Sequence, residues 1–188
     1  ARLHDNWDDP DGYYRVMLGE KLQQRYQIFA ILGRGIFATV VRARDLQQNG
    51  REVAIKIARR QETMYKAGMK EISILQRLSE ADPDNKMFIV HFFSHFEHRG
   101  HLCMVFESLG LNLREIVKRF GKDVGLNLQA VKTYTKQMLL ALALLREKQF
   151  VHADIKPDNI LVNEAKTIAK LADFGSASTC LLYTSDAA

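Results

Sequence analysis

Three strand-like segments linked by short turns lie between Tyr26 and Ala58, and this pattern constrains the fold most strongly. The segments cover residues 26–32, 39–44 and 52–58, and each is typical of a β-strand. Asn49-Gly50, between the second and the third segment, is a strong turn signal. Because two hairpins in series make neighbouring strands run in opposite directions, the first part of the chain is predicted to form an antiparallel sheet.

The hydrophobic period then changes from that of strands to that of helices. Apolar residues recur every third position from Met69 to Leu78, which predicts a helix over residues 64–80. Strands are expected at 88–97 and 101–106, followed by a helix from Leu113 to Phe120 that ends at Gly121. A long helix over 128–145 is apolar enough to be largely buried. The predicted fold class is α+β with two lobes, the first rich in strands and the second rich in helices.

Composition limits the class of protein. The chain has 188 residues, 47% of them hydrophobic, so it is at most one ordinary domain, or part of a larger one, and has a real core. No apolar run approaches the length of a membrane span, and no signal peptide pattern is present. Two cysteines are too few for a disulfide framework, and a net charge of +5 permits an anionic ligand without indicating nucleic acid binding.

Residues 33–40, "GRGIFATV", contain a Gly-x-Gly loop. A single match of this kind is most often a local turn. A dinucleotide-binding loop would lead into a helix, but here the β-branched run after Thr39 continues as a strand, which disfavours a nucleotide-dependent oxidoreductase. A glycine loop between two antiparallel strands instead forms a flap whose backbone can lie over phosphates. Ala38 stands where a third glycine is usual, and its small side chain still permits backbone access.

Lys56 in "VAIK" interrupts an otherwise apolar strand. Lysine is rarely buried without a partner, so Lys56 is expected to point into a cleft and meet an anion; an edge-strand lysine facing water is the alternative. Glu71 flanks the apolar face of the following helix and is the candidate partner. A Lys56–Glu71 pair would hold the ammonium in place for a phosphate.

The stretch "VHADIKPDNILV", residues 151–162, places oxygen-bearing side chains on a short loop between apolar segments. Asp154 and Asn159 lie there, and Asp173 of "DFG" follows 19 residues after Asp154. Hard cations such as Mg²⁺ bind such oxygens and keep phosphate oxygens as further ligands. One carboxylate then remains to accept a hydroxyl proton. Each acid taken singly is more often a turn cap. The glycine loop, Lys56, Glu71, the loop with Asp154 and Asn159, and the "DFG" segment together, in this order, point to catalysis.

This order of glycine loop, VAIK lysine, helix glutamate, HxDxKxxN loop and DFG resembles the protein kinase signature over about residues 22–178. Stretches such as "DNWDDPDGYYRV", "HLCMVFE" and "HADIKPDNILVNEAKTIAKLADFGSAS" are similar to the pre-mRNA processing factor four kinase family of the CMGC group. The resemblance implies an ATP- and Mg²⁺-dependent protein serine/threonine kinase in the nucleus whose substrates are spliceosomal proteins. It implies neither a membrane association nor direct binding of nucleic acid.

The resemblance also assigns roles to residues. Gly33 and Gly35 would cover the phosphates of ATP, and Lys56, held by Glu71, would bind the α- and β-phosphates. Asn159 and Asp173 would hold Mg²⁺, while Asp154 would orient the substrate hydroxyl and accept its proton, with Lys156 neutralising the γ-phosphoryl charge. The residues that would contact adenine are Leu32, Val40, Ala54 and Leu161 on its two faces, Phe106 at the back, and backbone groups of Glu107 and Leu109 at its edge.

Ala153 departs from the pattern of most kinases. Most members of the superfamily carry arginine at this position, where it receives a phosphorylated activation loop. Alanine cannot do so, and the family named above shares this alanine. We therefore expect an enzyme whose activity does not require a phosphorylated activation loop to bind at this position.

The resemblance also predicts the organisation of the chain. Residues 1–21, which are acidic and aromatic without a clear period, would form an ordered extension or a tail; 22–108 the complete N-terminal lobe; 109–179 the start of the C-terminal lobe. The "APE" element does not follow, and residues 180–188 are expected to be an artefactual tail, with a divergent start of the activation loop as the alternative. These 188 residues alone are expected to be unstable and inactive. The alternative function, from another class of protein, is that of a catalytically dead, kinase-like scaffold or nucleotide-binding module.

Four histidines in "HFFSHFEHRGH", residues 91–101, are expected to lie on a hairpin and not to bind a metal.

Overall fold

The computed structural model describes residues 7–122 and 124–180. These residues form two compact units. The first unit contains the chain up to Ser73 together with His91–Leu109, and the second contains Ile74–Val90 and the chain from Gly110 onward. The predicted artefactual tail, except for Cys180, lies outside the described residues, as do residues 1–6 of the predicted extension.

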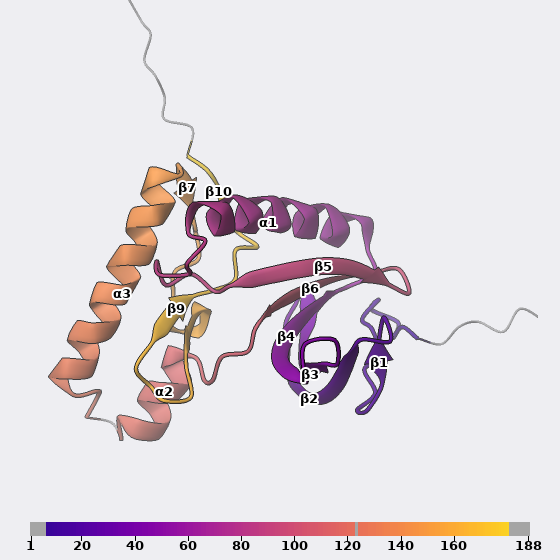
Figure 1. The fold of residues 1–188 in the computed structure, drawn as a ribbon, viewed down its shortest axis with the longest axis horizontal. Coiled ribbons are helices and arrows are strands. Elements are labelled where there is room, and N and C mark those ends of the chain that lie inside the picture. Colours follow the sequence, from indigo (N-terminus) through magenta and orange to yellow (C-terminus); the bar gives the residue numbers. More distant parts are fainter. Residues whose placement is uncertain (1–6, 123, 181–188) are drawn as a thin grey trace, which may run out of the picture. The chain divides into compact units, whose positions relative to one another are not determined.

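The first unit is built on a six-stranded antiparallel sheet with the order β1-β2-β3-β4-β6-β5 (Figure 1). Its strands are β1 (Lys21–Leu22), β2 (Tyr26–Arg34), β3 (Ala38–Asp45), β4 (Arg51–Ala58), β5 (Phe92–His98) and β6 (His101–Glu107). Asn49 and Gly50 both have positive φ in the turn between β3 and β4. The predicted antiparallel sheet is thus confirmed, and the histidine-rich segment forms the hairpin β5–β6.

One predicted strand starts later than expected. The sequence predicts a strand over residues 88–97, but β5 begins at Phe92. Residues 88–90 belong to the second unit, where Ile89 pairs with Leu171 in a parallel bridge and the Val90 N–H donates to the Leu171 carbonyl. The apolar run at 88–90 therefore pairs outside the large sheet, and Ile89 and Val90 are buried there.

The alternation of residues along the strands produces two different faces of the sheet. On β4, Val53, Ile55 and Ile57 are buried, whereas Ala54 and Lys56 on the opposite face are only partly buried. The buried face forms a core with aliphatic residues of β3 and β6. Residues of the N-terminal segment take part in that core: Tyr14 is a member, and Trp7 and Val16 pack against it. Residues 7–16 of the predicted extension are thus packed against the sheet.

Helix α1 (Glu62–Ala81) begins in the first unit. Gly68 allows a close approach to the sheet, because a Cβ at that position would lie 2.6 Å from Leu102 Cδ2. Of the predicted apolar stripe, Ile72, Leu75 and Leu78 are buried, but Met69 is exposed. The apolar stripe therefore predicts the helix correctly, but it predicts only part of the helix face that is buried.

The second unit contains two further α-helices, a short 3₁₀-helix and two pairs of short strands (Figure 1). Helix α2 (Leu113–Phe120) starts with a capping box formed by Asn112 and Glu115 and ends at Gly121, as predicted. Helix α3 (Leu128–Glu147) is capped by Asn127. The remaining elements are β7 (Phe150–Val151), the 3₁₀-helix η1 (Pro157–Asn159), β8 (Ile160–Val162), β9 (Ala169–Leu171) and β10 (Ser178–Thr179). Strand β7 pairs with β10, and β8 pairs with β9.

The prediction that α3 is largely buried is wrong. Its buried side chains are Tyr134, Gln137, Ala141, Leu144 and Leu145, which lie toward one side of the helix. Leu128, Val131 and Leu142 of the predicted apolar face are exposed. They lie beside the buried row and are 67%, 45% and 36% exposed, respectively. Within the described residues, no helix has both the length and the apolar character needed to cross a membrane.

Candidate active site

The glycine loop connects β2 and β3, as the sequence predicts. Neither Gly33 nor Gly35 has a positive φ, so the backbone conformation does not require glycine at either position. A Cβ added at Gly33 would have no atom within 4 Å, and one at Gly35 would meet only the Ala38 carbonyl at 3.9 Å. Packing within the first unit therefore does not require glycine either. The bare backbone is what a loop needs if a ligand approaches it closely.

Lys56 and Glu71 form an ion pair within the first unit. The Lys56 Nζ lies 2.9 Å from each carboxylate oxygen of Glu71. Lys56 occupies the partly buried face of β4, directly opposite Val40 of β3 and Met104 of β6. The side chains of Lys56 and Glu71 are 18% and 5% exposed, so the pair is largely removed from water. The predicted pairing is confirmed, while its role in binding a phosphate stays a prediction.

The residues predicted to contact adenine from the first unit lie on the same sheet or just after it. Ala54 is paired with Phe106, and both are partly buried, as is Val40, whereas Leu32 is half exposed. Leu109 uses its carbonyl to accept a hydrogen bond from Arg42 Nη2 at 2.8 Å. Its N–H donates to no described residue, and a free N–H is what the edge of a purine can use. Leu161 belongs to β8 of the second unit and is partly buried.

In the second unit, Asp154 is bound by two neighbours on the same loop. Lys156 Nζ donates to Asp154 Oδ2 at 2.8 Å, and Asn159 Nδ2 donates to both Oδ2 and the backbone carbonyl of Asp154, each at 2.9 Å. The Lys156 hydrogen bond lowers the pKa of the Asp154 carboxyl below its ordinary value, and the Asn159 amide acts in the same direction. The same pairing raises the pKa of Lys156. Asp154 is therefore a carboxylate held in a fixed position.

His152 joins this loop to the Asp-Phe-Gly segment, a role that the sequence analysis did not assign. Its buried ring makes a hydrogen bond between Nε2 and the Ala172 carbonyl at 2.9 Å and packs edge-on against Phe174 at 4.8 Å between ring centroids. The Ala172 N–H in turn donates to the Asn159 carbonyl at 2.8 Å. These bonds place Asp173 beside the loop that carries Asn159. The signal in the sequence was a histidine set between apolar residues two positions before Asp154.

Two residues of this region have an unusual backbone conformation. Ala153 has φ 65° and Asp173 has φ 59°, both in the left-handed region that β-carbon-bearing residues rarely adopt. Such conformations persist where the surrounding contacts fix the backbone, and they gather at functional sites. The hydrogen bonds of His152 and Asn159 are contacts of this kind. The turn at Ala153 lets the chain bury His152 while Asp154 remains partly exposed.

The donor set fits a magnesium ion only if phosphate completes it. Among residues 7–122 and 124–180, no cluster of three or more His, Cys, Asp or Glu side chains could hold a metal. Asn159 donates through Nδ2, and its Oδ1 accepts no hydrogen bond from any residue in the described part of the chain. Asp173 supplies one exposed carboxylate. An amide oxygen and a carboxylate are hard ligands that suit Mg²⁺ when phosphate oxygens and water supply the rest.

The predicted residues fall into two groups, one within each unit. The first unit holds the glycine loop, the Lys56–Glu71 pair and the residues around Ala54, and the second unit holds Asp154, Lys156, Asn159 and Asp173. The expectation that both groups face one cleft stays a prediction.

An antiparallel sheet with a glycine loop and a Lys–Glu pair, together with a His-x-Asp-x-Lys-x-x-Asn loop bound to an Asp-Phe-Gly segment, defines the phosphotransferase class that includes the protein kinases. The family model described as "Protein kinase domain" matches residues 26–184, and the chain belongs to this family.

Comparison with curated proteins shows which kinases the chain is similar to. It is 54% identical over 178 residues to "Serine/threonine-protein kinase prp4" of Schizosaccharomyces pombe, covering 95% of this chain and 37% of that protein. It is 48% identical over 177 residues to "Serine/threonine-protein kinase prpf4B" of Dictyostelium discoideum, covering 93% and 22%. "DYRK-family kinase pom1" of Schizosaccharomyces pombe is 39% identical over 172 residues, covering 91% and 16%. The resemblance predicted from the sequence is confirmed, and the chain spans well under half the length of these relatives.

Proposed function

We propose that this protein is an ATP- and Mg²⁺-dependent serine/threonine kinase. The arrangement of Asp154, Lys156 and Asn159 on one loop is the observation that carries this proposal, because it combines a hydroxyl-orienting carboxylate, a cation and a metal-binding oxygen. Phosphoryl transfer passes through a loose transition state, so catalysis depends mainly on positioning and on stabilising charge. Both requirements match a loop whose polar groups are already held by one another.

Nucleotide binding is assigned to residues of both units. Gly33 and Gly35 would lie over the phosphates, and Lys56, fixed by Glu71, would donate to the α- and β-phosphate oxygens. Leu32, Val40, Ala54, Phe106 and Leu161 would contact the adenine, with the carbonyl of Glu107 and the N–H of Leu109 at its edge. Asn159 and Asp173 would hold Mg²⁺, which supplies positive charge to the phosphates when it is bound.

Asp154 orients the acceptor in this proposal. Its carboxylate is ionised at neutral pH, as that of an ordinary aspartate is, and the hydrogen bonds from Lys156 and Asn159 lower its pKa further. It accepts a hydrogen bond from the serine or threonine hydroxyl and aligns that oxygen for attack on the γ-phosphorus. As the new P–O bond forms, the bond between the γ-phosphorus and the oxygen that bridges it to the β-phosphate breaks, ADP leaves, and Asp154 receives the hydroxyl proton. Lys156, two residues later, is placed to offset the negative charge of the transferring group. The lysine at this position resembles that of serine/threonine kinases rather than tyrosine kinases.

The similarity to proteins named prp4 and prpf4B supports a narrower substrate class. We propose that the substrates are pre-mRNA splicing proteins and that the enzyme works in the nucleus.

Transfer of radiolabelled γ-phosphate to purified spliceosomal proteins, followed by phosphoamino acid analysis, tests the proposal. The full-length gene product should produce phosphoserine or phosphothreonine, and chelation of Mg²⁺ should abolish the signal. Binding of Mg·ATP without any transfer would instead identify a catalytically dead, kinase-like scaffold. Transfer to general acceptor proteins but not to splicing proteins would retain the kinase and reject the substrate class.

A further inference from the structure

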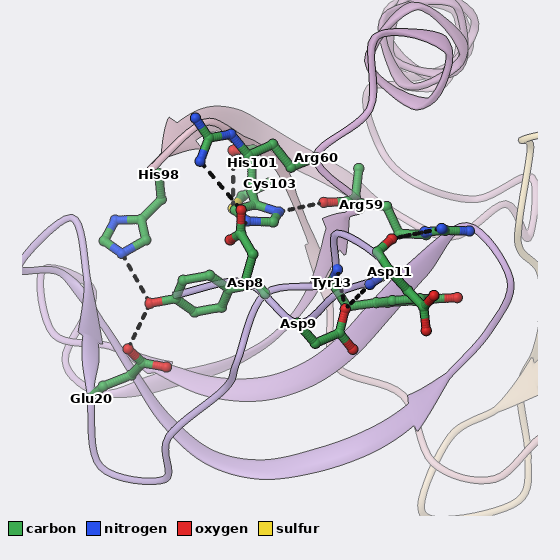
Figure 2. Close-up of polar contacts among 12 residues, drawn as sticks. Asp8, Asp9, Asp11, Tyr13, Glu20, Arg59, Arg60, His98, His101 and Cys103 are labelled. Carbon is green, nitrogen blue, oxygen red and sulfur yellow. Dashed lines mark hydrogen bonds and ion pairs between the residues drawn. The ribbon is translucent and has the colours of Figure 1, made fainter. Parts of the chain in front are cut away.

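The N-terminal segment, residues 7–19, lies against the sheet of the first unit (Figure 2) and is fixed there at both ends. Near its start, Asp8 Oδ1 lies 2.8 Å from Nε2 of the fully buried His101, whose Nδ1 meets the Ala58 carbonyl at 2.8 Å. Near its end, the Gly19 N–H donates to the Ile28 carbonyl of β2 at 2.8 Å. Because neither anchor involves the glycine loop, the segment is held independently of it.

Tyr13 reaches from this fixed segment to the tip of the glycine loop. Its hydroxyl lies 2.8 Å from the Gly35 carbonyl and 2.9 Å from the Ile36 carbonyl, so one proton is shared between two acceptors. The Tyr13 side chain is nearly buried, whereas Ile36 and Phe37 beside it are 73% and 61% exposed. Since the glycines have no side chains to pack, these backbone contacts are among the few that fix the loop.

Two arginines strengthen the same attachment. Arg34, inside the loop, places its guanidinium 3.6 Å from the Tyr13 ring centroid and donates to Asp9 Oδ2 at 2.6 Å. Arg59, just after β4, donates to the Ile36 carbonyl at 3.2 Å and to the Asp11 carbonyl at 2.6 Å. The loop is thus connected through Tyr13 to the N-terminal segment and through Arg59 to the end of the strand that carries Lys56.

We propose that Tyr13 is a positioning residue for nucleotide binding, a role that rests on the proposed kinase function. Tyr13 holds the backbone of residues 35–36 in the conformation in which the loop covers phosphates. A loop that is already ordered loses less conformational entropy when a ligand binds, and the ligand therefore binds more tightly. Tyr13 touches neither nucleotide nor acceptor in this proposal, so its removal should weaken ATP binding without changing the chemical step.

The substitution Tyr13→Phe tests this, because it removes the hydroxyl and keeps the ring under Arg34. Tyr14→Phe is the matched control: the same change at the neighbouring position removes a hydroxyl that is bonded to Glu20 and His98 instead of the loop. Both variants are made in the full-length gene product. Calorimetry measures the Kd of Mg·ATP, steady-state kinetics measure kcat and KM, and hydrogen exchange without nucleotide measures the protection of amides 33–37.

Tyr13→Phe should raise the Kd and KM for ATP about fivefold, the size expected for one hydrogen bond. The kcat and the KM for protein substrate should change by less than about twofold, and the loop amides should exchange faster. Tyr14→Phe should match the wild type in all these respects. Unchanged ATP affinity and exchange in Tyr13→Phe, or equal effects of both substitutions, would overturn the proposal. If the wild type bound no ATP, the kinase function would fail, and the exchange data alone would still decide whether Tyr13 holds the loop.

Discussion

The ammonium nitrogen of Lys56 lies 2.9 Å from both carboxylate oxygens of Glu71, and Glu71 is almost fully buried. The substitution Glu71→Gln would keep the shape of this side chain and remove the charge that fixes Lys56. Because the proposed phosphate donor would lose its position, we expect kcat/KM for ATP to fall about 100-fold. Phosphorylation kinetics measure the change, and circular dichroism checks that the variant is folded.

The control for this prediction lies on the same helix. Glu62 pairs with Lys66 at 2.6 Å on the exposed surface of α1, where ion pairs contribute little. Glu62→Gln should therefore retain wild-type kinetics. Wild-type rates in Glu71→Gln would show that the pair does not position Lys56 for catalysis.

The ion pair between Arg25 and Asp45 should make the stability of the protein depend on pH. Arg25 donates two hydrogen bonds to Asp45, at 2.7 and 2.6 Å, and this pairing lowers the pKa of Asp45 below the ordinary value of 3.8. A carboxyl whose pKa is lowered by folding stabilises the protein above its unfolded pKa, and that contribution disappears as the pH falls through the folded pKa. Asp45→Asn should cost about 1–2 kcal/mol at pH 7, and the difference from the wild type should shrink below about pH 4.

Urea unfolding of the two proteins across this pH range measures the effect. Asp84→Asn is the control, since Asp84 pairs with Lys86 in an exposed position, and its removal should change the free energy of unfolding little at any pH. A difference between Asp45→Asn and the wild type that stays constant down to pH 2 would contradict this account.

The two cysteines of the chain should differ in reactivity. Cys103 is buried in the core of the sheet, and burial raises the pKa of its thiol to about 12, whereas Cys180 is exposed. Because the thiolate is the reactive form, iodoacetamide at pH 8 should alkylate Cys180 and spare Cys103 in the native protein. Mass spectrometry of peptides before and after denaturation measures the modification. Rapid alkylation of Cys103 without denaturant would show that the sheet core opens readily.

Ala153 offers a test of the backbone at the catalytic loop. Its φ of 65° is unfavourable for a residue with a β-carbon, and its side chain is exposed. Ala153→Gly should raise the free energy of unfolding by about 0.5–1 kcal/mol, since relief of the strain exceeds the added entropy of the unfolded chain. Ala143→Gly, at an exposed position inside α3, should instead lower it by about 1 kcal/mol. Destabilisation of both variants to the same extent would contradict the assigned conformation.

The elements with a regular hydrophobic period were predictable from the sequence, and those ordered by distant contacts were not. The strands around Ile28, Val41 and Ile55 and the capped helix at Leu113 follow from local pattern and turn residues. The N-terminal segment has no regular hydrophobic period. Its residues Asp8 and Tyr13 are instead held by partners that lie 93 and 22 residues away in the sequence. For the same reason, composition alone did not show which side of α3 is buried.

The candidate site was predictable to a similar degree. Spacing and residue type indicated Lys56, Asp154 and Asn159, because charged and amide groups between apolar strands require a partner or a ligand. The part played by His152 depends on its contacts with Ala172 and Phe174, which the spacing of the motif does not reveal.

The central claim is that Asp154 orients the acceptor hydroxyl for transfer of the γ-phosphoryl group. The most direct measurement compares single-turnover phosphoryl transfer by wild type, Asp154→Asn and Asp158→Asn, with Asp158 chosen because it lies on the same loop and pairs with the exposed Arg114. The account predicts that Asp154→Asn binds Mg·ATP normally but transfers phosphate about 100-fold or more slowly, while Asp158→Asn stays within about threefold of the wild type. Transfer by Asp154→Asn at the wild-type rate would contradict it.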